Sequence, residues 1–167
     1  MDKKKPIVLL INDIHVSKDN ISQFMLNWHE ALSICEKHGI MDLIIGGDLW
    51  QSRSAQPLST LIAVKDALLQ ATAKGLTVTI APGNHDKVDQ EDLNSYNHIY
   101  ADYDRIEVVN DYEVIYLADD VNLYIVGYFP ENGSFSERLN GIVESLDKEC
   151  FNILYCHEGI RGGLAQS

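Results

Sequence analysis

The stretch PIVLLIN, residues 6–12, indicates the fold class of this chain. Its apolar side chains give way abruptly to polar ones, which is the pattern of a buried β-strand that leads into a loop. Two segments with apolar side chains at helical spacing follow, at residues 21–35 and 58–69, and each leads into a short apolar run, at residues 41–45 and 76–81. Alternating strands and helices with short connections are typical of βαβ crossovers. We therefore predict an α/β fold with a parallel sheet covered by helices.

The second half of the sequence has a different pattern. Three short strands are expected there in a meander, at residues 106–109, 114–117 and 123–126. A helix at residues 135–146 and a last strand at residues 151–156 then close the chain. These elements predict a second sheet beside the first one. No linker, repeat or low-complexity segment divides the sequence, so we predict a single domain over residues 1–167.

Composition and charge exclude several classes of protein. The apolar runs are far shorter than the ~20 residues that span a bilayer, and the basic start of the chain is not followed by a signal-peptide pattern. The 3 cysteines include no CxxC pair, which argues against a disulfide framework. We therefore expect a cytoplasmic protein without a membrane partner. The net charge of −12 opposes a basic groove for nucleic acid, but it allows a phosphate substrate that binds through divalent cations.

Polar motifs stand directly after the predicted strands. They are DIH at residues 13–15, GD at 47–48, GNHD at 83–86 and a histidine at position 157. The carboxyl ends of parallel strands share one edge of a sheet, so motifs that lie far apart in the sequence converge in one crevice. Carboxylate, imidazole and amide oxygen together form a ligand set that suits Mn, Fe or Zn. The sequence therefore predicts a metal site at this edge.

The roles of three residues follow from their places in the motifs. Asp48 stands between the other motifs, so its carboxylate can bridge two ions at the ~3.5–4 Å separation of two-metal hydrolytic sites. His85 follows the expected ligand Asn84, and its ring can therefore point at the substrate and protonate the leaving oxygen. Asp86 is predicted to orient His85. These roles indicate the hydrolysis of a phosphoester.

The motifs Asp13-Ile14-His15, Gly47-Asp48-Leu49-Trp50 and Gly83-Asn84-His85-Asp86, in this order, resemble those of the calcineurin-like metallophosphoesterase superfamily. The second motif, with Pro57 soon after it, and the third motif look most like the nuclease subunit of double-strand-break repair complexes, the SbcD type of bacteria and phages. The Ser/Thr protein phosphatase branch matches less well, because it has a glutamate after the Asn-His pair. The resemblance implies a sandwich of two sheets flanked by helices.

The resemblance also implies a set of metal ligands and a catalytic pair. The first of two divalent ions would bind Asp13 and His15, the second would bind Asn84 and His157, and Asp48 would bridge them. Mn is the expected metal, with Fe, Zn or Mg as alternatives, and His85 with Asp86 would be catalytic. The family closes its site with a Gly-His-x-His motif that does not occur in this sequence. We therefore expect the carboxyl-terminal strands of the family fold to be missing and the chain to be the amino-terminal part of a longer domain.

The function implied by the resemblance is metal-dependent hydrolysis of DNA phosphodiester bonds, by an exonuclease or endonuclease of DNA repair. An SMC-like ATPase and a second copy of the chain are the expected partners. Two alternatives stay open. A phosphodiesterase or phosphatase for a small nucleotide would suit the acidic surface equally well. A non-catalytic interaction scaffold of the same fold, like the retromer subunit, would suit the absence of the last motif.

Overall fold

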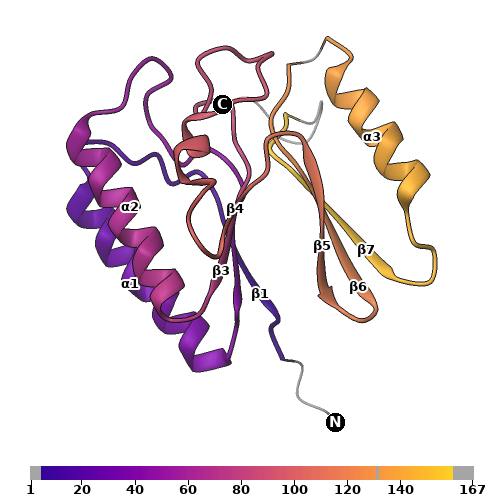
Figure 1. Ribbon diagram of the computed structural model, residues 1–167, viewed down its shortest axis with the longest axis horizontal. Coiled ribbons are helices and arrows are strands. Elements are labelled where there is room, and N and C mark those ends of the chain that lie inside the picture. The colour runs from indigo at the N-terminus through magenta and orange to yellow at the C-terminus, as the bar shows by residue number, and fades with distance from the viewer. Residues whose placement is uncertain (1–4, 131, 160–167) are drawn as a thin grey trace, which may run out of the picture.

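Two β-sheets lie face to face between helices in this protein (Figure 1). The computed structural model describes residues 5–130 and 132–159. Helices α1 (Ile21–His38) and α2 (Leu58–Ala73) cover the outer side of the first sheet, and helix α3 (Ser134–Ser145) lies outside the second. This arrangement confirms the predicted α/β fold with two sheets flanked by helices. Within the described ranges, no helix has both the length and the apolar character needed to cross a membrane.

The first sheet is parallel throughout and has the order β1-β2-β3-β4. Its strands are β1 (Val8–Ile11), β2 (Asp42–Ile45), β3 (Thr77–Ile80) and β4 (Ile106–Val108). The register pairs Ile11 with Ile45 and Ile45 with Ile80, so the first three strands end at the same level. The loops that carry the predicted motifs therefore start from one edge of the sheet.

Helix α1 packs on this sheet because its apolar side chains repeat on one face. Phe24, Trp28 and Leu32 on this face are buried in the core between the helices and the sheet. The Trp28 indole N–H donates to the Ala67 carbonyl of α2 at 2.8 Å, so its polar group is satisfied inside the core. Gly39 ends the helix with a φ of 66°, the left-handed conformation that favours glycine. Each large buried side chain contributes about 1.5–3 kcal/mol to folding.

The second sheet is smaller and mixed. It contains β5 (Tyr112–Ala118), β6 (Val121–Val126) and β7 (Phe151–Cys156) in this order. β5 and β6 form an antiparallel pair, whereas β7 pairs parallel with β6 after the chain has passed through α3. Ile44 of β2 belongs to the same buried cluster as Leu123 and Ile125 of β6, and this cluster forms the core between the sheets.

The predicted meander is wrong at its first strand. Residues 106–108 form β4, which pairs parallel with β3 in the first sheet. The Val78 N–H donates to the Arg105 carbonyl, and the Val109 N–H donates to the Ile80 carbonyl, both at 2.9 Å. The long connection after β3 carries the chain back along the sheet, so the next strand runs parallel to β3 and cannot form a hairpin with it.

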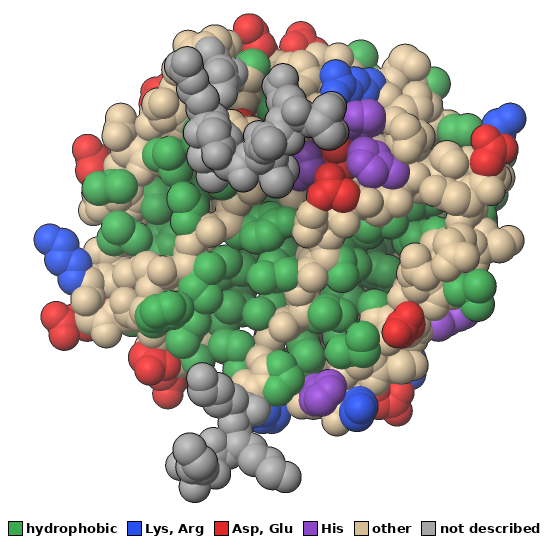
Figure 2. All heavy atoms as spheres, turned by 180° about the vertical axis from the view of Figure 1, so that it is seen from behind, with side chains coloured by type: hydrophobic (Ala, Val, Ile, Leu, Met, Phe, Trp, Pro, Cys, Tyr) green, Lys and Arg blue, Asp and Glu red, His purple; other side chains and the backbone are tan. Residues whose placement is uncertain are grey.

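Strands β1 and β7 each lie at an edge of their sheet. Both expose apolar side chains, since Leu10 is 39% exposed and Leu154 is 49% exposed. Figure 2 shows hydrophobic side chains gathered over the middle of one face, below a group of acidic and histidine side chains. Open edges of this kind are where further strands can add to a sheet. That carboxyl-terminal strands of the family fold are missing from this chain stays a prediction.

Candidate metal centre

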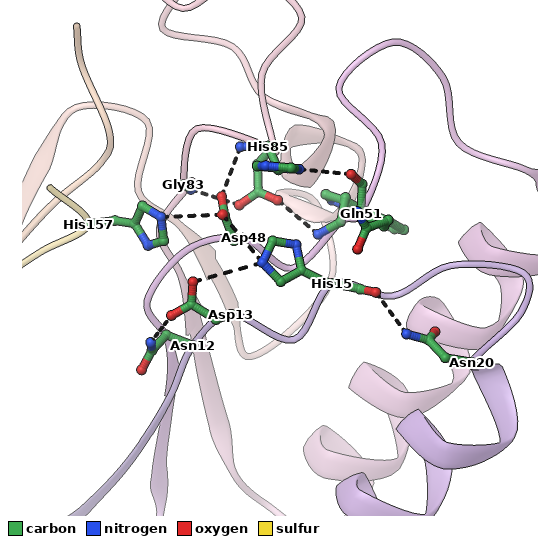
Figure 3. A network of polar contacts seen from close by, with 11 residues as sticks. Asn12, Asp13, His15, Asn20, Asp48, Gln51, Gly83, His85 and His157 are labelled. Atoms are coloured by element: carbon green, nitrogen blue, oxygen red, sulfur yellow. Dashed lines mark hydrogen bonds and ion pairs between the residues drawn. The ribbon is translucent and has the colours of Figure 1, made fainter. Parts of the chain in front are cut away.

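The polar motifs meet at the carboxyl ends of β1, β2 and β3 (Figure 3). Six predicted site residues make contacts with one another there: Asp13, His15, Asp48, Asn84, His85 and His157. The first five follow strands of the first sheet, whereas His157 follows β7 of the second. β7 reaches this edge because Tyr155 packs directly on Gly46, where no side chain lies in the way. The structure thus brings the four sequence motifs together as predicted.

Three of the site residues have a left-handed backbone conformation. Asp13, His15 and Asp48 have φ angles of 53°, 50° and 51°, and among the described residues other than glycine only Arg105 shares this conformation. The conformation costs about 1–2 kcal/mol for each residue with a side chain. The Asp13 N–H donates to the Gly47 carbonyl at 3.0 Å, and the His15 N–H donates to the Asp48 carbonyl at 2.9 Å. Strain that the surrounding structure holds in place is typical of functional sites.

Asp48 is the centre of the cluster. Its side chain is nearly buried, and its Oδ2 atom lies 3.4 Å from Nε2 of His157 and 3.6 Å from Nε2 of His15. Its Oδ1 atom accepts the backbone N–H of His85 at 2.8 Å. Burial opposes ionisation, but the hydrogen bonds from His157 and His85 hold the pKa of Asp48 below its ordinary value. The hydrogen bond with Asp48 in turn raises the pKa of His157, although burial acts against it. Asp48 is therefore ionised at neutral pH.

The candidate ligand atoms form two groups that share Asp48. One group contains His15, Asp48 and His85, the other contains Asp13, Asp48 and His157, and within each group the ligand atoms lie within 4.8 Å of one another. A shared carboxylate agrees with the predicted bridging position of Asp48. Nε2 of His15 also lies 3.9 Å from Oδ1 of Asp13, so the predicted pair Asp13 and His15 is close as well, and the division of the ligands between two ions stays a prediction. The cluster can therefore hold cations on both sides of Asp48.

Two details test whether these residues fit a divalent cation. Nδ1 of His15 is buried, and within the described ranges it has no hydrogen-bond partner. The Asn84 amide lies 3.1 Å from both Asp48 carboxylate oxygens. With its NH₂ group toward them it donates to both, and its oxygen then accepts from the Arg53 guanidinium. With its oxygen toward them, acceptors face each other and only a cation between them would stabilise the contact. The residues therefore fit a divalent cation.

Asp86 binds the backbone rather than the His85 ring. Its fully buried carboxylate accepts the N–H groups of Gly83 at 2.7 Å and Trp50 at 3.0 Å. Burial raises the pKa of Asp86 to about 6, although these hydrogen bonds act to lower it. The His85 ring is instead placed by the Gln51 carbonyl, which lies 2.8 Å from Nδ1. The structure thus differs from the prediction that Asp86 orients His85, and Asp86 joins the second motif to the third.

Two glycines allow the motifs to approach this closely. A side chain at Gly83 would collide with the backbone nitrogen and the carboxylate of Asp48. A side chain at Gly47 would collide with the His157 ring, and Gly47 also has a φ of 115° that favours glycine. The glycines in the second and third motifs are therefore needed for close packing of the site.

The cluster opens into a cavity of about 470 Å³. Its lining includes Asp13, Asn84, Tyr128, Tyr155 and His157. The two tyrosines, Gln51 and Arg53 do not belong to the sequence motifs and are not predicted from them. Gln51 and Arg53 follow the second motif closely, and the tyrosines lie at or beyond the ends of β6 and β7, so proximity to a motif or strand end is the only sequence signal that could have found them.

Comparison with known proteins gives a family for this chain. The family described as "Calcineurin-like phosphoesterase" matches residues 7–162. A search of curated protein sequences finds no match. Among 69 matching chains of solved structures, one belongs to the crystal structure of nuclease MPE from Pseudomonas putida. That chain is 24% identical over 70% of this chain, with a TM-score of 0.46, and the match covers 52% of its own length. This chain thus spans about half the length of that relative.

Proposed function

Because the chain belongs to the calcineurin-like phosphoesterase family, we propose that it is a metal-dependent phosphoesterase that hydrolyses DNA phosphodiester bonds with two divalent ions. The observation that carries this proposal is the pair of ligand groups that share the carboxylate of Asp48. A bridging carboxylate with histidine and carboxylate ligands is a donor set of two-metal hydrolytic sites. We propose Mn as the metal, with Fe, Zn or Mg as alternatives.

The residues of the cluster would act in two ways. The ions would be held by Asp13, His15, Asp48, Asn84 and His157. Bound cations polarise a phosphoryl oxygen and activate water for in-line attack. His85 would act on the leaving group, because the Gln51 carbonyl accepts from Nδ1 and leaves Nε2 toward the departing oxygen; the imidazolium form would give that oxygen its Nε2 proton and become the neutral ring with the proton on Nδ1. The His85 ring lies edge-on to His15 with 4.9 Å between centroids, which keeps it beside the cluster.

Two observations support nucleic acid as the substrate. The cavity of about 470 Å³ is larger than a phosphate group needs, and the rings of Tyr128 and Tyr155 line it. Aromatic rings beside a phosphate site can stack on the neighbouring bases. The second and third motifs resemble those of SbcD-type nucleases, which supports a role in DNA repair in the cytoplasm.

A partner would supply the positive surface that this acidic chain lacks. With a net charge of −12 the chain alone is repelled by the DNA backbone. We propose an SMC-like ATPase as this partner, on the resemblance to SbcD-type subunits. We also propose self-association through α1 and α2, because Leu26, Leu58 and Ile62 on these helices are exposed.

Hydrolysis of bis-p-nitrophenyl phosphate and of single-stranded DNA in the presence of Mn²⁺ tests this proposal. His85→Ala is expected to lower kcat on single-stranded DNA by roughly 10²–10⁴-fold, the range for loss of a general acid, and to lower it much less on bis-p-nitrophenyl phosphate, whose nitrophenolate leaves without a proton. His29→Ala is the matched control, since His29 is exposed on α1 and its ring forms a hydrogen bond with Gln70, away from the metal-site residues. Its kcat should equal that of the wild type.

The other outcomes separate the alternatives. Hydrolysis of mononucleotides without cleavage of DNA would replace the nuclease by a small-nucleotide phosphodiesterase or phosphatase. Binding of Mn²⁺ without hydrolysis of any phosphoester would contradict the enzyme and favour the interaction scaffold. An Asp48→Ala variant that binds a partner protein without metal would then support that scaffold.

A further inference from the structure

We propose that Arg53 binds the phosphate anion of the substrate, and that the Asn84 amide makes Arg53 available only when a cation occupies the site. The inference rests on the proposed function and adds a substrate-binding residue to it. Arg53 is exposed, and its guanidinium contacts the Asn84 side chain. Among the described lysines and arginines, no other side chain forms a hydrogen bond with one of the predicted site residues.

The position of Arg53 is set by its loop. The Ser52 hydroxyl accepts the N–H groups of residues 54 and 55, which turns the loop back on itself. The Tyr96 hydroxyl donates to the Arg53 carbonyl at 3.2 Å. Two residues earlier, the Gln51 carbonyl contacts the His85 ring at 2.8 Å. The same loop therefore contacts both His85 and Asn84 of the third motif.

The charge of Arg53 is free to meet an anion. Within residues 5–130 and 132–159, Arg53 forms no ion pair with a carboxylate, unlike Arg105 and Arg138. The rest of the cluster offers carboxylates, imidazoles, an amide and two tyrosine hydroxyls, so Arg53 is the one side chain with a permanent positive charge that contacts this part of the described chain. Guanidinium is planar and binds two phosphate oxygens at once, which suits it to this task.

Asn84 links this anion site to the cation site. In one orientation its NH₂ group donates to Asp48 and its oxygen accepts from Arg53. A cation beside Asp48 needs the amide oxygen as a ligand, so the amide must turn and its oxygen must leave Arg53. The donors of Arg53 are then unpaired when the cation is in place. Cation binding should therefore precede and strengthen phosphate binding.

Isothermal titration of inorganic phosphate and of Mn²⁺ tests the inference in the wild type, Arg53→Met and Arg53→Lys. Arg53→Met is expected to weaken phosphate binding to the Mn²⁺-loaded protein by about 10- to 100-fold, the loss of charged hydrogen bonds. Arg53→Lys should recover part of this loss. Mn²⁺ binding without phosphate should be unchanged or tighter in Arg53→Met, because a positive charge and a competitor for the Asn84 oxygen are removed. A merely structural role for Arg53 predicts weaker Mn²⁺ binding instead.

Arg105→Met is the control for the change in net charge, since Arg105 precedes β4 at the opposite end of the sheet. It should bind phosphate and Mn²⁺ as the wild type does. Equal phosphate affinity in Arg53→Met and wild type, no phosphate binding by the wild type, or a joint loss of phosphate and Mn²⁺ affinity would overturn the inference. The titrations measure the binding of phosphate and Mn²⁺ and do not require turnover. If phosphate binding depends on Arg53 but the protein cleaves no phosphoester, only the proposed enzymatic function is refuted.

Discussion

Replacing the buried Lys87 by methionine is expected to stabilise the protein at neutral pH. Lys87 is 0% exposed, its Nζ atom donates to the Tyr128 carbonyl at 2.8 Å, and it lies 4.0 Å from the centre of the Phe129 ring. The guanidinium of Arg138 lies over the same ring at 3.4 Å. Burial, with the nearby charge of Arg138, lowers the pKa of Lys87 to about 8 from the ordinary 10.5. The native state therefore disfavours the charged form that dominates at pH 7.

The magnitude follows from this shift. A pKa lowered from 10.5 to about 8 corresponds to roughly 3 kcal/mol of stability lost at pH 7. Methionine fills the space of the lysine stem without the charge. It gives up a hydrogen bond of about 1–1.5 kcal/mol and a cation–π contact of about 1 kcal/mol. The net expectation for Lys87→Met is a gain of about 1 kcal/mol in the free energy of unfolding at pH 7.

The dependence on pH gives the sharper test. The folded protein releases the Lys87 proton near pH 8 and the unfolded chain near pH 10.5, so the unfolded state binds more protons in between. Stability of the wild type therefore recovers, relative to Lys87→Met, by about 1 kcal/mol between pH 7 and pH 9. The advantage of the variant should disappear by pH 9.

Urea unfolding at both pH values, followed by the fluorescence of the buried Trp28 and Trp50, measures these differences. Lys74→Met serves as the control, because Lys74 pairs with Glu36 on the surface and removing it should cause no such pH dependence. The reasoning is refuted if Lys87→Met is less stable than the wild type at pH 7, or if their difference is the same at both pH values.

Two further predictions concern the cation site. Asp48 raises the pKa of His157, so protons compete with the metal and the Mn²⁺ affinity should fall from pH 8 to pH 6. Titration calorimetry in buffers of different ionisation enthalpy should detect the release of protons when Mn²⁺ binds. If no protons are released, His157 is not a ligand. Gly83→Ala should weaken Mn²⁺ binding by at least about tenfold, because its methyl group would displace Asp48. Gly159→Ala meets no neighbouring atom within 4 Å and should bind Mn²⁺ like the wild type.

The fold could be predicted wherever a helix or strand is long enough for the spacing of its apolar side chains to identify it. The pattern of β1, α1, β2, α2 and β3 is read correctly for this reason. β4 has only 3 residues, and its apolar pattern would suit either sheet. The hydrogen bonds of Val78 and Val109 with the neighbouring strand decide its position, and the side-chain pattern does not encode them.

The ligand candidates could be predicted because each follows a strand end, whereas the residues around them could not. Arg53 reaches Asn84 only because its loop folds back through Ser52. Asp86 lacks a contact that its sequence position suggests, since it directly follows His85 but does not bind that ring. The buried N–H groups of Gly83 and Trp50 bind its carboxylate instead. Contacts between loops therefore set the roles of residues that do not themselves end a strand.

The backbone of the first motif shows how the site depends on the fold. Asp13 and His15 keep their left-handed conformations because their N–H groups donate to carbonyls of the second motif. These residues and Asp48 are thus placed by the pairing of β1 with β2. His157 instead depends on the second sheet, which Tyr155 holds against Gly46. The group of His15, Asp48 and His85 therefore rests on the parallel sheet alone, and the group of Asp13, Asp48 and His157 needs both sheets.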